Sequence, residues 1–218
     1  MLRLWQLISP ALPVGAYAYS QGLEYALHAE WIRDEQDVKQ WIQGQIKFSL
    51  SHLDIPVLKR LYLAWSKNDI DGVNEWSQFL IASRESSELL AEDRQLGRAL
   101  AILLADLGME RAEPFRRSDI ACFASLLSLA AVEWNISINE IAPAYLWTWL
   151  ENQVSAAIKL VPLGQTAGQR ILLRVAEHIP AAVATGLAID DDEIGMLAPA
   201  VSIASALHET QYSRLFRS

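Results

Sequence analysis

Apolar residues recur at helical spacing along almost the whole chain. Val38, Trp41, Ile42 and Ile46 fall on one face of a helix, and the stretch 145–161 continues the same pattern. No segment alternates between apolar and polar residues with the period of two that a half-buried strand requires. There is also no fixed-period repeat and no low-complexity linker. We therefore expect residues 1–218 to form a single all-α domain, a helical bundle of about eight to ten helices.

Local signals place some of the helix ends. Ser137, followed three residues later by Glu140, is typical of a capping box at the start of a helix. The stretch "MERAEPFRRS" (109–118) is expected to be a loop, with Ser118 or Asp119 capping the apolar helix that follows. That helix is apolar nearly all round, which predicts a central position in the bundle.

The opening stretch "SPALPVGAYAYSQGLE" differs from the rest of the chain. Pro10 and Pro13 fix the backbone and remove two donors, and Ser20 can cap the helix that follows. In an extended segment Tyr17 and Tyr19 would project to one side. The segment is either an ordered arm packed on the bundle or a rigid surface that presents tyrosines to a partner, and the residues favour both equally.

Composition limits the classes of function. Hydrophobic residues make up 52% of the chain and charged residues only 20%, so the apolar surface serves either protein interfaces or a large, well-filled core. The longest apolar run, 120–132, is too short to cross a bilayer, and no secretion signal is visible, so we expect no membrane contact. The net charge of −8 argues against nucleic-acid binding.

Catalytic signatures are not visible. The single cysteine, Cys122, lies in an apolar run, which predicts a buried, inert thiol in a reducing, cytoplasmic protein. The stretch "PLGQTAGQR" lacks the lysine of a phosphate-binding loop, and no nucleophile motif is present. A bundle enzyme or cofactor binder would need paired inward ligands, which the sequence lacks. We therefore expect no enzymatic activity and no catalytic residue.

The histidines are weak metal candidates. Glu24 and His28 are one helical turn apart, and His208 neighbours Glu209, so each pair offers part of a site. A solvated or hydrogen-bonded histidine is the favoured alternative for both. A metal shared between two copies of the chain stays open.

Two further segments carry more polar or aromatic residues than a plain bundle needs. In "ASRESSELLAED", Arg84 and Glu88 would pair on a solvated helix face, close to Glu85. The end of the chain, "HETQYSRLFRS", is rich in aromatic residues and arginine. We expect it to dock, either on its own bundle or on another chain.

Four stretches together resemble the UreF family of urease accessory proteins: "LISPALPVGAYAYSQGLE", "RESSEL", "KLVPLGQTAGQ" and "HETQYSRLFRS". The resemblance runs from Leu4 to Ser218. It implies an all-α, homodimeric, non-catalytic protein that acts with a UreD-like (UreH-like) accessory protein and a UreG-like GTPase on urease apoprotein. It also implies that the assembly delivers nickel and couples GTP hydrolysis to activation of the metal centre, with no cofactor tightly bound to this chain.

The resemblance also assigns binding roles to an N-terminal segment (1–24), to the region around the third motif and to a C-terminal tail (209–218). The partner-binding candidates are Tyr17, Tyr19, Ser20, Glu24, Glu85, Lys159, Gln165, Gln169, His208, Glu209, Tyr212, Arg214, Leu215, Phe216 and Arg217. The chain departs from the family pattern at Leu90 and Leu207, where the family often has arginine, and this puts the local partner contacts in doubt.

Overall fold

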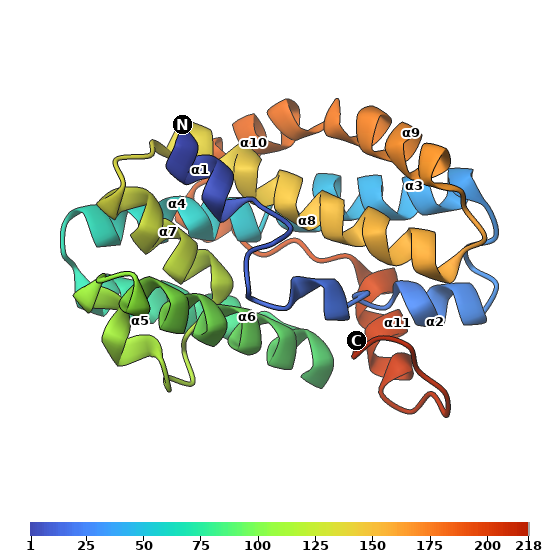
Figure 1. Cartoon of the computed structure of the whole chain (residues 1–218), viewed down its shortest axis with the longest axis horizontal. Coiled ribbons are helices and arrows are strands. Elements are labelled where there is room, and N and C mark those ends of the chain that lie inside the picture. The colour runs from blue at the N-terminus through green and yellow to red at the C-terminus, as the bar shows by residue number, and fades with distance from the viewer. Residues whose placement is uncertain (218) are drawn as a thin grey trace.

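The computed structural model describes residues 1–217, and these residues form helices and connecting turns without any strand (Figure 1). The all-α prediction is confirmed, but the described chain has eleven α-helices, more than the eight to ten expected. They are α1 (Leu2–Leu7), α2 (Leu23–His28), α3 (Glu35–Gln45), α4 (Asp54–Ser66), α5 (Ile70–Ala82), α6 (Ser87–Asp106), α7 (Phe123–Glu133), α8 (Ile138–Leu160), α9 (Gln165–Ala176), α10 (Ile179–Ala188) and α11 (Pro199–His208).

Short 3-10 turns fill several of the connections. Ala16–Ala18, Glu110–Phe115 and Asp191–Glu193 each form one, and α3 continues into a π-helical turn at Ile46–Leu50. The expectation of a plain loop at 109–118 was therefore wrong in part. Phe115 is buried there, and its packing against the core favours an ordered turn.

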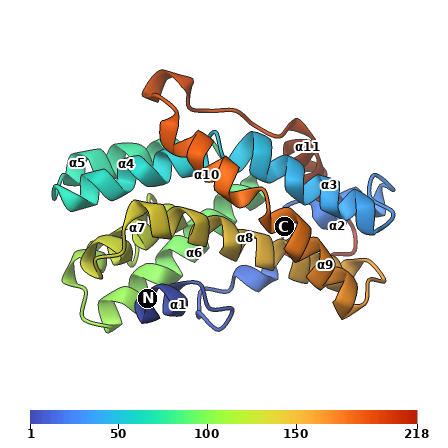
Figure 2. The same cartoon turned by 90° about the horizontal axis from the view of Figure 1, so that it is seen from above.

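The long helix α8 runs through the middle of the molecule and packs along α9. On one side α4 packs against α5 and α7, and α7 packs in turn against α6. Viewed from above, α3, α4 and α10 form a layer on one side of α8, α1 lies on the other, and α6 crosses beneath (Figure 2). The short helix α11 closes one end of the bundle, where it packs against α2 and α6.

The helix caps show where local sequence signals suffice. Both hydrogen bonds of the predicted capping box are present between Ser137 and Glu140 at the start of α8. The predicted caps for α7 were wrong, because that helix begins at Phe123. Its first amide donates instead to Asp93 Oδ1 at 2.9 Å, a carboxylate from the neighbouring helix α6. A side chain from another helix satisfies the same backbone donor, but the sequence next to the helix start then contains no capping residue that could be recognised.

Two glycines set the path of the N-terminal segment. Gly15 and Gly22 both adopt positive φ, at 82° and 79°, a conformation that other residues rarely adopt. At Gly22 a Cβ would also lie 2.9 Å from the backbone nitrogen of Ser205 in α11. The glycine therefore allows the start of α2 to approach α11 closely, and this brings Glu24 to the end of α11.

The stretch Gln165–Ala188 has the length and apolar character of a membrane span, although it contains no long uninterrupted apolar run. It is divided into α9 and α10, and it carries Arg170 and Arg174. Apolar helices that pack in a protein core pass the same test of length and composition, so this stretch alone does not identify a span.

Candidate functional site

The C-terminal tail docks on its own bundle, which is one of the two expected alternatives. Glu24 accepts two backbone hydrogen bonds from the tail, from Leu215 N at 2.7 Å and from Phe216 N at 2.8 Å. The amide of Arg217 donates to the carbonyl of Ala18 at 2.9 Å. The last residue of the predicted tail, Ser218, lies outside the described residues. The two ends of the chain thus form one structure, with the tail laid along the N-terminal segment.

A buried histidine lies behind this contact. His208, at the end of α11, has no exposed surface. Its Nδ1 lies 2.8 Å from Glu88 Oε2 of α6, and its Nε2 lies 3.2 Å from Glu24 Oε2 of α2. The other oxygen of Glu88 accepts from Arg214 Nη1 at 2.9 Å. Both carboxylates that flank His208 therefore also hold the tail.

Aromatic side chains and a lysine complete the contact. Phe216 is buried, and the Lys159 ammonium lies 5.6 Å from the centre of its ring. The same ammonium lies 5.8 Å from the ring centre of Tyr17, which is 67% exposed. Both distances suit cation–π attraction. Lys159 thus lies between the N-terminal segment and the tail and contacts an aromatic ring of each.

The two tyrosines of the N-terminal segment do not project to one side, as an extended segment would require. The 3-10 turn at Ala16–Ala18 rotates them apart, so that Tyr17 faces solvent and Tyr19 is buried. The Tyr19 hydroxyl donates to Gln95 Oε1, which also accepts from Arg217 Nη1 at 3.3 Å. Burial raises the pKa of Tyr19, which keeps it protonated as a donor.

The docked tail exposes two large side chains. Tyr212 is fully exposed, and Leu215 is 67% exposed even though its amide is bound by Glu24. We call Tyr17, Lys159, Tyr212 and Leu215 the terminal surface. Exposed aromatic and aliphatic groups on an ordered backbone are typical of protein-binding surfaces.

The remaining partner-binding candidates are distributed around this surface. Ser20 is buried, and its hydroxyl accepts from Glu24 N at 3.3 Å, so it supports the first turn of α2. Glu209 accepts from Ser87 N at 2.8 Å, and the hydrogen bonding to Ser87 lowers the pKa of this carboxyl. Gln165 and Gln169 are exposed at the start of α9.

The two departures from the family pattern and the second histidine lie in different surroundings. Leu207 is 40% exposed beside His208, whereas Leu90 is partly buried against the core. His28 is exposed at the end of α2, with its ring centre 6.4 Å from that of Tyr25. Within residues 1–217 no three or more histidine, cysteine or acidic side chains are grouped so that they could hold a metal ion.

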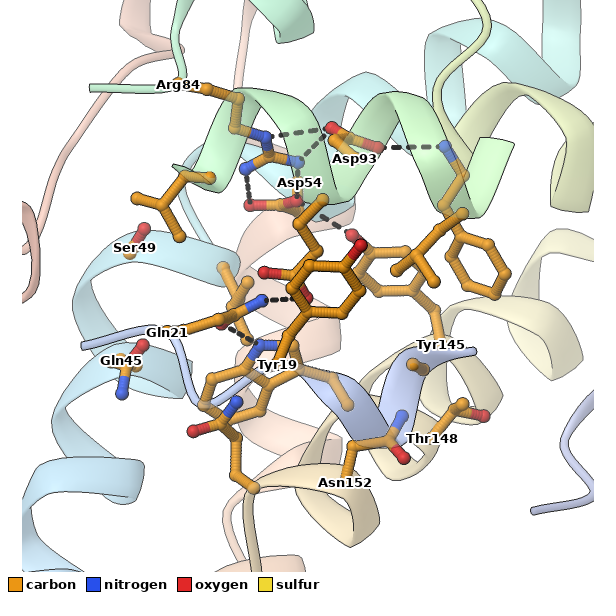
Figure 3. Close-up of a pocket in the computed structure, with 18 of the residues that line it drawn as sticks. Tyr19, Gln21, Gln45, Ser49, Asp54, Arg84, Asp93, Tyr145, Thr148 and Asn152 are labelled. Carbon is orange, nitrogen blue, oxygen red and sulfur yellow. Dashed lines mark hydrogen bonds and ion pairs between the residues drawn. The ribbon is translucent and has the colours of Figure 1, made fainter. Parts of the chain in front are cut away.

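Beside Tyr19 the bundle encloses a cavity of ≈ 130 Å³ (Figure 3). Gln21 spans one wall, where it donates to Glu92 at 2.9 Å and accepts from Trp149 Nε1 at 2.8 Å. Exposed Glu85 also lines the opening. Residues 9–21 of the N-terminal segment supply much of the lining, so the cavity lies directly under that segment.

At the far wall of this cavity lies a buried charge network (Figure 3). Arg84 contacts Asp54 Oδ1 of α4 and Asp93 Oδ2 of α6, each at 2.8 Å, and Tyr145 of α8 donates to Asp54 at 2.8 Å. Burial alone would lower the pKa of Arg84, but the two aspartates raise it well above its usual value. The predicted pairing of Arg84 with Glu88 was wrong. Arg84 instead joins α4 to α6, and the bond from Tyr145 to Asp54 adds α8 to the network.

The cysteine is inert, as expected. Cys122 has no exposed surface, and burial raises the pKa of its thiol to about 12. The thiolate that would act as a nucleophile or metal ligand is therefore absent near neutral pH.

The fold and the terminal surface together define a class: an all-helical protein whose ordered chain ends expose aromatic and aliphatic side chains. A family model described as UreF matches residues 32–176. The chain is 56% identical to the urease accessory protein UreF of Alkalilimnicola ehrlichii, over 99% of this chain and 95% of the relative. It is also 49% identical to the urease accessory protein UreF of Teredinibacter turnerae, over 100% of this chain and 98% of the relative.

The chain therefore belongs to the UreF family of urease accessory proteins, which implies a role in the maturation of urease. The matches cover both chain ends, so the terminal surface lies within the compared region.

Proposed function

We propose that this protein is a non-catalytic scaffold, which assembles as a homodimer in the cytoplasm with a UreD-like accessory protein and a UreG-like GTPase on urease apoprotein. In this assembly nickel is the cargo. The protein couples GTP hydrolysis by its partner to insertion of nickel into urease. Family membership and the terminal surface support the proposal, since an ordered tail with exposed Tyr212 and Leu215 is suited to bind a protein.

The contacts suggest a division of roles within the chain. Glu24, Glu88 and His208 are occupied in holding the tail, so we assign them a positioning role. Tyr212 and Leu215 are free to enter a pocket on the UreD-like partner. Exposed Gln165 and Gln169, on the neighbouring start of α9, are proposed to contact another member of the assembly.

Truncation tests the role of the tail. A chain stopped before Tyr212 is expected to stay helical, because Phe216 is the one residue among the described residues 212–217 that belongs to the core cluster. It is also expected to lose co-purification with the UreD-like partner. Circular dichroism measures the first outcome, and a pull-down from cells that express the neighbouring urease genes measures the second. A folded truncated chain that still binds the partner normally would remove the tail from the interface.

A further inference from the structure

The tail is held by a charged cluster whose centre is a histidine. His208 lies fully buried between Glu24 of α2 and Glu88 of α6, with one ring nitrogen facing each carboxylate. The tail adds Arg214, which binds the second oxygen of Glu88. The nearby acid Glu209 is directed away, toward the amide of Ser87. The cluster therefore has two carboxylates, one arginine and one histidine of variable charge.

The number of N–H donors on the His208 ring determines whether it can hydrogen-bond to both carboxylates. A neutral ring has one N–H donor and one nitrogen lone pair, whereas the protonated ring has two donors. With Glu24 and Glu88 both ionised, a neutral His208 would direct a lone pair at a carboxylate oxygen. The protonated ring satisfies both carboxylates, and together with Arg214 it balances their two charges.

We propose that His208 is a protonation-controlled latch: its protonated ring holds Glu24 and Glu88 in the positions that bind the tail, and loss of the proton releases the tail. Glu24 is the key connection, because the same oxygen, Oε2, faces His208 Nε2 and accepts the Phe216 amide. The lone pair of a neutral ring would repel Glu24 Oε2, and this oxygen would then move away from the Phe216 amide. The latch regulates the surface on which the proposed function rests.

The direction of the pH effect follows from linkage. In the proposed latch the docked tail requires the protonated ring between the two carboxylates, so docking is favoured at low pH and weakens as pH rises. Histidine is the side chain that most readily changes charge near neutral pH. The proposal therefore predicts a tail that is docked in mildly acidic solution and increasingly released in mildly basic solution.

Hydrogen exchange of the isolated full-length chain tests the latch. The protection factors of the Leu215 and Phe216 amides are expected to fall about tenfold or more between about pH 5.5 and about pH 8.5, the effect of losing one hydrogen bond to a charged group. The amide of Leu150, in the middle of α8, serves as an internal control and should keep its protection. Because no partner is present, this result is independent of whether the tail binds a UreD-like protein.

Two variants sharpen the test. His208→Gln cannot carry the positive charge, so its tail protection should be low and should vary little with pH. His28→Gln removes an exposed histidine and should behave as the wild type does. Should His208→Gln fail to fold, nitrogen NMR of the wild-type ring gives the answer directly. Two protonated ring nitrogens in the docked state support the latch. A neutral His208 with the tail still docked, or tail protection that does not change with pH, would overturn it.

Discussion

Replacing Tyr212 and Leu215 together with alanine should weaken binding to the proposed UreD-like partner by on the order of a hundredfold, with little change in stability. Both side chains are exposed in the free protein, and neither belongs to the core cluster. Their removal therefore leaves the tail backbone held by Glu24, as in the wild type. Titration calorimetry with the purified partner measures the affinity, and urea unfolding measures the stability.

A matched control separates a specific contact from a general loss of apolar surface. Leu173 on α9 is 66% exposed, almost the same as Leu215 at 67%. Leu173→Ala should therefore bind the partner as well as the wild type. Equal affinity of the Tyr212 and Leu215 double variant and the wild type would mean that the partner recognises some other part of the molecule.

Replacing Arg84 with methionine should lower the free energy of unfolding by about 3–5 kcal/mol. The methionine fills similar space but leaves Asp54 and Asp93 buried without their counter-charge. Urea unfolding at neutral pH measures the loss. Part of the stability should return as the pH is lowered, because protonated aspartates need no counter-charge.

The exposed pair of Arg170 with Glu35 provides the control for this variant. It has a similar distance, 2.7 Å, but Arg170 is 58% exposed. Arg170→Met should unfold at nearly the same urea concentration as the wild type, because exposed ion pairs are screened by water. Equal stability of Arg84→Met and Arg170→Met would contradict this account. It would mean that the buried network contributes little to holding α4, α6 and α8 together.

The features that the sequence predicted correctly depend on neighbours close along the chain. The helical period is visible in a single window, and Ser137 and Glu140 are three residues apart in one turn. The incorrect predictions concern pairs of residues whose spacing fits a regular helix or strand but whose backbone adopts another conformation. Arg84 and Glu88 have helical spacing, yet Ser86 caps α6, so Arg84 lies outside the helix that carries Glu88. Likewise Tyr17 and Tyr19 have the spacing of an extended segment, but Tyr17 lies in the 3-10 turn Ala16–Ala18 and Tyr19 follows directly after it.

The parts of the site that could not be predicted depend on distant segments. His208 was recognised only beside Glu209, but its hydrogen-bonding partners are 184 residues away at Glu24 and 120 away at Glu88. Asp54 and Arg84 are likewise 30 residues apart. No spacing rule links such positions. The packing of α11 against α2 and α6 brings His208 to its two glutamates, and the packing of α4 against α5 places Asp54 near Arg84, which follows α5. The motifs indicated the segments to compare, whereas the fold determines which of their residues hold the tail and which are exposed.

Restoring urease activation in cells tests the central claim most directly. A urease operon that lacks its own UreF gene is complemented with the full chain, with the chain stopped before Tyr212, or with the double alanine variant at Tyr212 and Leu215. Urease activity and urease-bound nickel are then measured, with the operon's own UreF protein as the positive control. The scaffold account predicts active, nickel-loaded urease with the full chain and little of either with the two tail variants. Equal nickel loading by all three chains would contradict the role of the tail. Failure of the full chain, when it is soluble and binds the operon's UreD-like protein, would contradict the proposed function.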